Sequence, residues 1–137
     1  MNIYFSGSIR GGRNDQELYA LIITELQKYG EVLTEHIGKK NLGGDGEIKL
    51  TDKEIYERDV ELIQKSDLVI AEVTNPSLGV GYELAYAEML KKPVVCLFRK
   101  IEDKRLSAMV NGNSYFRVLT YTDLEDAAGK LKEFFNK

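Results

Sequence analysis

The sequence predicts an α/β protein built on a parallel sheet, and two patterns along its 137 residues carry that prediction. Short runs rich in β-branched and aromatic residues alternate with longer segments whose apolar residues recur at helical spacing. Such alternation makes consecutive strands parallel and joins them by right-handed helical crossovers. Five strand-like runs indicate a three-layer, doubly wound, mainly parallel sheet of the flavodoxin or Rossmann type. We expect residues 1–137 to form one domain.

A glycine-rich turn separates the first predicted strand from the first predicted helix. Residues 2–6 (NIYFS) are expected to form the strand, and residues 15–29 carry an apolar stripe at helical spacing. Asn14 or Asp15 is suited to cap that helix, and Gly30 is suited to end it.

The remaining elements continue the alternation. A second strand is expected at 31–34, and a glycine-rich polar loop follows at 38–47. The second helix covers about 52–65, with Thr51 or Asp52 as its cap. The later elements are a strand at 67–73, a helix that starts near Gly81, strands at 93–98 and 115–121, and a helix at about 123–136.

Composition excludes several classes of protein. With 43% hydrophobic and 30% charged residues the chain is globular, and its net charge of -3 lacks the basic surplus that nucleic acid or an anionic membrane requires. One cysteine (Cys96) and one histidine (His36) rule out an internal disulfide and a cysteine-rich zinc site, so we expect no metal and no cofactor. The N-terminus lacks a signal sequence and no apolar run approaches about 18 residues, which favours a cytoplasmic protein.

The turn after the first strand combines residue types that commonly hold an anion. It consists of Gly7, Ser8, Ile9, Arg10, Gly11, Gly12 and Arg13. Glycines let backbone N–H groups approach an anion, Ser8 offers a hydroxyl, and Arg10 and Arg13 bring charge near the amino end of a helix. The spacing matches neither a P-loop nor a dinucleotide fingerprint. On spacing alone, a phosphate site and a turn with solvated arginines stay equally open.

A second serine- and glycine-rich turn, at 74–81, follows the third predicted strand and leads to Glu83. In an open parallel sheet, these two turns face each other across the crevice at the carboxyl ends of the strands. Glu83 is expected in the first turn of the next helix, where the helix dipole favours its ionised form. It is either a capping group or a placed catalytic carboxylate. The rest of that helix is apolar nearly all round, so we expect burial on several sides.

Asp59 lies where a solvent-exposed residue is not expected. On a helical wheel of the second predicted helix it falls near the middle of the apolar face. A carboxylate there destabilises the fold unless it is partnered or used, so Asp59 either bonds backbone groups or acts with Glu83. Two carboxylates beside an anion cradle suit retaining cleavage of a glycosidic bond in a phosphorylated substrate. One attacks the anomeric carbon, and the pair handles the leaving group and water.

Other residues near the strand ends are less telling. Tyr4 either orients the nucleophile or is an aromatic strand residue, and His36 either contacts a base ring or, more simply, is a surface residue before a loop. Glu35 and Glu72 are weaker candidates. Cys96, within an apolar strand, is expected to be inert core.

Four long stretches carry a resemblance to a known family: YFSGSIRGGR, VLTEH, SDLVIAEVTNPSLGVGYELA and KPVVCLFR. They resemble the 2'-deoxynucleoside 5'-phosphate N-hydrolases of the nucleoside 2-deoxyribosyltransferase superfamily, over nearly the whole chain. The resemblance implies an enzyme that cleaves the N-glycosidic bond of 2'-deoxynucleoside 5'-monophosphates, giving the free base and 2-deoxyribose 5-phosphate. By the same resemblance Glu83 is the nucleophile that forms a covalent glycosyl-enzyme, Asp59 is a second essential acid near the sugar, and Tyr4 positions the nucleophile.

The resemblance also implies how substrate is held. The matched substrate and phosphate contacts are Ser8, Arg10, the backbone of 7–13, Ser77 and Gly79. Ser107 matches a phosphate-binding serine that the family supplies from the neighbouring subunit, which implies a homodimer with shared sites. The segment 38–51 departs from the family's usual loop in length, which leaves base preference open. Ser6 stands where the family often has Cys, a change we expect to be neutral.

Other functions stay open on the sequence. A deoxyribosyltransferase would pass the same intermediate to a second base, but it handles nucleosides, so Ser8, Ser77 and Ser107 favour a monophosphate hydrolase. The sequence does not separate hydrolysis of deoxyribonucleotides from that of ribonucleotides. A nucleotide-binding sensor without catalysis would gain nothing from acidic residues at the anomeric carbon.

Overall fold

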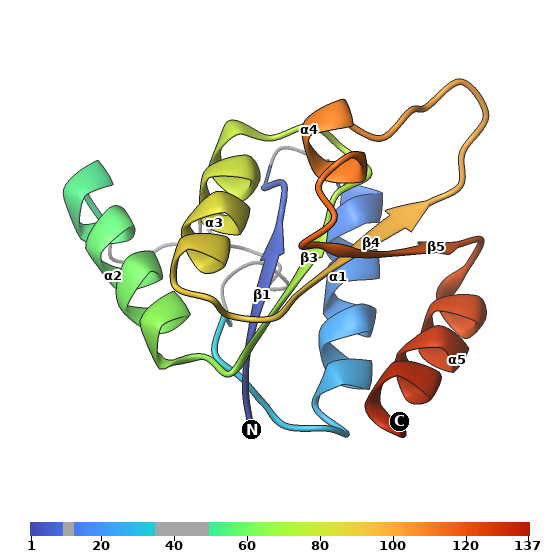
Figure 1. Ribbon diagram of the computed structural model, residues 1–137, viewed down its shortest axis with the longest axis horizontal. Coiled ribbons are helices and arrows are strands. Elements are labelled where there is room, and N and C mark those ends of the chain that lie inside the picture. The colour runs from blue at the N-terminus through green and yellow to red at the C-terminus, as the bar shows by residue number, and fades with distance from the viewer. Residues whose placement is uncertain (10–12, 35–49) are drawn as a thin grey trace.

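The computed structural model describes residues 1–9, 13–34 and 50–137, and for Arg13 and Asn14 the backbone alone. In this part of the chain five strands form one sheet in the order β2-β1-β3-β4-β5, and every neighbouring pair is parallel (Figure 1). The strands are β1 (Asn2–Gly7), β2 (Glu31–Val32), β3 (Leu68–Glu72), β4 (Val94–Arg99) and β5 (Arg117–Tyr121). The helices are α1 (Arg13–Leu26), α2 (Asp52–Lys65), α3 (Leu78–Met89), α4 (Ala108–Asn111) and α5 (Leu124–Phe135). This order is that of a flavodoxin-like, doubly wound sheet, so the predicted fold class is confirmed.

Helices cover both faces of the sheet, which makes three layers (Figure 1). The apolar residues of α1 and α5 pack on one face, against Ile3 and Phe5 of β1. Those of α2 and α3 pack on the other face, against Tyr4 and Val69. Because side chains alternate along a strand, neighbouring residues of β1 serve different layers.

The winding of the chain reverses between β1 and β3, since β2 lies on one side of β1 and β3 to β5 lie on the other. Ligands of such sheets bind at the carboxyl ends of the strands at this point. Gly7, which ends β1, pairs with Glu72, which ends β3, so the two turns singled out above start side by side. A Cβ at Gly7 would lie 3.1 Å from the ring of Tyr19 on α1, so any larger residue there would have to displace that ring slightly.

The first two helices agree with the sequence in part. Thr51 caps α2 as expected, in a capping box with Glu54. The expected cap of α1 is wrong, because that helix begins at Arg13 and contains both Asn14 and Asp15. The Asp15 side chain bonds Asn75 and Arg99 on other elements, so tertiary contacts use it in place of a cap.

The position of Glu83 also differs from the expected one. Ser77 caps α3 by accepting a hydrogen bond from the backbone N–H of Val80 at 3.2 Å, so the helix begins at Leu78, three residues before Gly81. Glu83 therefore lies in the second turn, and the argument from the helix dipole does not apply to it. The helix α4 was not expected, because four residues are too few for a periodic signal.

The helix α3 is less buried than its sequence suggests. One face of α3 is buried through Val80, Leu84 and Ala87, but Leu78 is 97% exposed and Met89 is 68% exposed. The expectation of burial on several sides is therefore wrong for a single chain. None of the helices in the described part of the chain combines the length and the apolar character of a membrane span.

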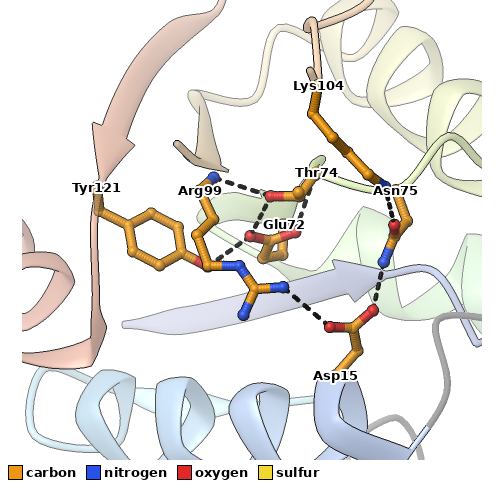
Figure 2. A network of polar contacts seen from close by, with 7 residues as sticks. All are labelled: Asp15, Glu72, Thr74, Asn75, Arg99, Lys104 and Tyr121. Atoms are coloured by element: carbon orange, nitrogen blue, oxygen red, sulfur yellow. Dashed lines mark hydrogen bonds and ion pairs between the residues drawn. The ribbon is translucent and has the colours of Figure 1, made fainter. Parts of the chain in front are cut away.

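A buried carboxylate ties β3 to β5 at the carboxyl edge of the sheet (Figure 2). Glu72 accepts hydrogen bonds from the Thr74 backbone N–H at 2.9 Å, the Thr74 hydroxyl at 2.7 Å and the Tyr121 hydroxyl at 2.5 Å. Burial and the nearby Glu72 raise the pKa of Tyr121, so its phenol stays protonated and keeps donating. Glu72 thus has a structural role that accounts for its place at a strand end.

Replacement of Tyr121 by Phe is expected to lower the free energy of unfolding by about 1–3 kcal/mol, because the buried Glu72 carboxylate loses one donor. Urea unfolding followed by circular dichroism measures the loss. Tyr115→Phe is the matched control: it removes an exposed hydrogen bond of 2.7 Å to the Lys92 carbonyl and should cost less than about 1 kcal/mol. Equal losses in the two variants would contradict the role given to Glu72.

Candidate active site

The Glu83 carboxylate lies between α3 and β1 and receives two hydroxyl donors from the strand. The Tyr4 hydroxyl donates to Oε2, and Ser6 Oγ donates to Oε1 at 2.7 Å. Tyr4 and Ser6 are fully buried and lie two residues apart, so both point toward the same face of the sheet. Each oxygen of the carboxylate is thereby held from one side. The capping interpretation of Glu83 is wrong, since Ser77 caps α3.

The surroundings of Glu83 act on its pKa in opposite directions. Burial raises the pKa of Glu83 above its ordinary value, and the nearby charge of Asp59 adds to the rise. The hydrogen bonds from Tyr4 and Ser6 favour the charged form and offset part of that effect. Burial, followed by Glu83, raises the pKa of Tyr4, so its phenol stays a donor. The result is a carboxylate that is partly withdrawn from water yet well supplied with donors.

Asp59 reaches the same space from α2. Its side chain is only 18% exposed, and Arg58 Nε donates to its Oδ1 at 3.2 Å. Its charge raises the pKa of both Glu83 and Tyr4. The low exposure of the Asp59 side chain agrees with the inward orientation that the helical wheel predicted, and the Tyr4–Glu83 contact is as expected. Two carboxylates in unequal environments are suited to two different steps of acid–base or nucleophilic chemistry.

The cradle after β1 is only partly described. Gly7 ends β1, Ser8 is buried next to it, and Ile9 is largely exposed. The predicted ligands Arg10, Gly11 and Gly12 lie outside the described residues, as does His36, and nothing is described of the Arg13 side chain.

Ser77 and Ser107 lie together at one cavity. Both line a mostly apolar cavity of about 550 Å³ between α3 and α4, which Glu83 and Asp59 do not line. Each hydroxyl caps a helix: Ser77 accepts from Val80 N–H and Ser107 from Met109 N–H, both at 3.2 Å. A capping hydroxyl keeps its own proton to donate. Gly79 lies beside them, where a Cβ would be 3.8 Å from Ser77 Oγ.

Sequence reasoning missed several polar residues at this edge. Ser6 was considered only as an exchange for the family's Cys, and its bond to Glu83 was not foreseen; its spacing of two from Tyr4 was the available signal. Asp15 accepts a hydrogen bond from Arg99 Nη2 at 3.1 Å and another from the Asn75 amide (Figure 2). These partners stand 84 and 60 residues from Asp15 in the sequence, so no local pattern could reveal them.

Known proteins agree with this picture. The sequence profile described as nucleoside 2-deoxyribosyltransferase matches residues 3–120. The 5-hydroxymethyl-dUMP N-hydrolase of Esox lucius is 51% identical to this chain over 98% of it and 96% of its own length. That of Tetraodon nigroviridis is 54% identical over 99% of this chain and 98% of its own length.

The likeness of fold extends further than the likeness of sequence. The solved structure of CMP N-glycosidase from Clostridium botulinum has a TM-score of 0.69 to this chain at 18% identity, covering 98% of this chain and 99% of its own. Given the profile match and the relatives of about half identity, the chain belongs to the nucleoside 2-deoxyribosyltransferase family, as its motifs predicted.

Proposed function

We propose that this chain hydrolyses the N-glycosidic bond of 2'-deoxynucleoside 5'-monophosphates and releases the free base and 2-deoxyribose 5-phosphate. The observation that carries the proposal is the Glu83 carboxylate, which is held by Tyr4 and Ser6 and lies near Asp59. It occurs in a chain about half identical, over nearly its full length, to proteins named 5-hydroxymethyl-dUMP N-hydrolase.

The proposed reaction has two displacements at the anomeric carbon. A Glu83 oxygen bonds to C1′ while the C1′–N bond breaks, and the base leaves with the electron pair and takes up a proton from solvent. Water then bonds to C1′, the bond to Glu83 breaks, and a proton of the water passes to one of the two carboxylates, which returns it to solvent. Asp59 is assigned to the sugar side, where its negative charge stabilises the positive charge that develops on the sugar ring. Tyr4 and Ser6 hold Glu83 in line for the attack.

A phosphate-binding edge accompanies this chemistry in the proposal. Ser8 lies in the turn after β1, Ser77 ends the turn after β3 and Gly79 lies in the first turn of α3, near the point where doubly wound sheets bind ligands. Together with the turn 7–13 they are proposed to hold the 5'-phosphate. A 5'-phosphate requirement separates the monophosphate hydrolase from a nucleoside transferase.

Incubation with deoxynucleoside and ribonucleoside monophosphates, 5-hydroxymethyl-dUMP among them, and with the matching nucleosides tests the activity. Free base is followed by chromatography, with and without an acceptor base. We expect cleavage of deoxynucleoside monophosphates, and Glu83→Gln should lower turnover about a thousandfold or more while 2-deoxyribose 5-phosphate still binds. Glu61→Gln, an exposed change on α2, is the control and should keep wild-type turnover. Base exchange between nucleosides without cleavage of any monophosphate would overturn the proposal.

The pH dependence of kcat/KM should change when a hydroxyl group that donates to Glu83 is removed. Its raised pKa means that the carboxylate is protonated, and activity lost, as pH falls through a value above the ordinary glutamate pKa of about 4.3. Ser6→Ala removes a bond that favours the ionised form, so the acidic limb of kcat/KM should move to higher pH by about half a unit to one unit.

The control for this prediction is Ser66→Ala. It removes a buried hydroxyl that donates to the Ile63 carbonyl at 2.7 Å, away from Glu83, and should leave the acidic limb in place. A limb that stays in place, or moves to lower pH, in Ser6→Ala would contradict the role of Ser6.

We further propose a homodimer in which Ser107 completes the partner's site. The exposure of two apolar residues and their place beside the cavity support it. Leu78 at 97% and Met109 at 83% are nearly fully exposed although apolar, and they flank the cavity that holds Ser77 and Ser107. Apolar side chains gathered at one exposed place are typical of protein–protein interfaces. In a single chain Ser107 shares its cavity with Ser77, so subunit exchange is needed to tell which site it serves.

Mixed dimers of Ser107→Ala and Glu83→Gln chains separate the two arrangements. If sites are shared, Glu83 of one chain works with Ser107 of the other, and each mixed dimer regains one intact site. Turnover per mixed dimer should then approach half that of the wild-type dimer. Turnover no higher than the mean of the two parent variants would mean that Ser107 serves its own chain.

A further inference from the structure

Three turns at the carboxyl edge of the sheet carry the serines assigned above to phosphate. Ser8 lies in the turn after β1, Ser77 in the turn after β3, and Ser107 in the turn after β4. A bound phosphate needs donors from separate turns at a fixed spacing. In the proposed dimer Ser8 and Ser77 serve the chain's own site and Ser107 serves the partner's. The contacts that hold these turns to one another therefore bear on substrate binding at both sites without touching substrate.

A network of hydrogen-bonded polar side chains connects the three turns (Figure 2). Asp15, only 7% exposed, stands in the first turn of α1, directly after the turn of Ser8. Its Oδ2 accepts from Asn75 Nδ2, and Asn75 stands two residues before Ser77. Asn75 Oδ1 accepts from Lys104 Nζ at 2.5 Å, and Lys104 stands three residues before Ser107.

The end of β4 is bonded to the same network of side chains. Arg99, the last residue of β4, donates from Nη2 to Asp15 Oδ1 at 3.1 Å. The backbone N–H of Arg99 donates to the Thr74 hydroxyl at 2.8 Å, next to Asn75. The bonds of Asp15 to Asn75, of Asp15 to Arg99 and of Asn75 to Lys104 each include one charged group, and such bonds are stronger than neutral ones.

We propose that Asp15 and Asn75 are positioning residues that set the spacing of the Ser8 and Ser77 turns in the chain's own site, and that the bond from Lys104 to Asn75 holds the turn of Ser107, which the proposed dimer presents to the partner's site. The inference rests on the proposed function, because it concerns how that site is held in shape. Neither residue is assigned a contact with substrate, so neither is a catalytic residue.

The order of donors and acceptors along this network tolerates few amino-acid substitutions. Asn75 must present its amide nitrogen to Asp15 and its oxygen to Lys104. In Asp15→Asn, the new amide cannot accept from both Arg99 and Asn75, so two donors face each other at one link. In Asn75→Asp, two carboxylates face each other. The double variant Asp15→Asn/Asn75→Asp restores a donor and an acceptor at every link and leaves the net charge unchanged.

Charge and geometry predict opposite patterns for the single variants. Asp15→Asn removes a negative charge and Asn75→Asp adds one, so electrostatics alone would strengthen anion binding in the first and weaken it in the second. Positioning predicts that both weaken it and that the double variant recovers. The pair of single variants therefore distinguishes a positioning role from a general effect of charge.

The experiment measures binding of 2-deoxyribose 5-phosphate by calorimetry, together with kcat and KM for the monophosphate that the wild-type chain cleaves best. We expect each single variant to weaken binding and to lower kcat/KM about tenfold or more, and the double variant to return within about threefold of wild type. If a buried variant does not fold, Asn75→Ala, at a turn residue that is only partly buried, should show the same loss of affinity.

The control is Asp67→Ala, which removes a carboxylate that accepts from the Asn2 backbone N–H at 2.7 Å at the opposite edge of the sheet. It should lower stability and leave affinity unchanged. Wild-type affinity in Asp15→Asn and Asn75→Asp, or a folded double variant that does not recover, would overturn the positioning role. A wild-type chain that binds the sugar phosphate but cleaves no monophosphate would overturn the proposed function alone, because the affinity series still tests positioning.

Discussion

A carboxylate that is partly withdrawn from water needs donors, and this fold supplies Glu83 with two from a single strand. Tyr4 and Ser6 are buried, lie two residues apart on β1 and donate to different oxygens of Glu83. Burial alone would leave the carboxyl group protonated over a wider range of pH, whereas the two hydroxyls favour the ionised form and restrict rotation of the side chain. The rest of the candidate site is arranged around this contact, because Asp59 approaches the group that the strand holds in place.

The alternation of side chains along the strands divides the work between the two faces of the sheet. Tyr4 and Ser6 point toward α3, so the chemistry proposed here lies on the α2 and α3 face. Asp15, on α1, and Glu72, bonded to Tyr121 of β5, belong to the polar contacts of the other layer, at the same carboxyl edge (Figure 2). One layer thus holds the carboxylates of the proposed reaction, and the other ties together the turns proposed to hold phosphate. A single edge of a parallel sheet can serve both purposes because turns from either face meet there.

The apolar surface of α3 links the fold to the proposed assembly. A helix that is apolar nearly all round is stable in water only if other elements cover it. Within the described residues, the sheet covers the side of Val80 and Leu84, and Leu78 stays in solvent. The helix that carries Glu83 is therefore also the helix with the most apolar surface left to cover. In the proposed dimer this surface forms the interface, so the second subunit packs against the helix that carries Glu83.

The sequence by itself determined the alternation of strands and helices, the parallel sheet, the family, the contact of Tyr4 with Glu83 and the inward orientation of Asp59. Those features follow from local periodicity, from the wheel position of Asp59 and from contiguous motifs. The tertiary structure decided what depends on distant partners. It showed that Ser6 bonds Glu83, that Asp15 joins Asn75 and Arg99 rather than capping its helix, and that Glu72 is held by Tyr121. It also left the outer face of α3 uncovered. The physical reason is one of range: periodicity reports which face a residue occupies, whereas a hydrogen bond between residues 60 or 84 positions apart depends on which elements the fold brings together.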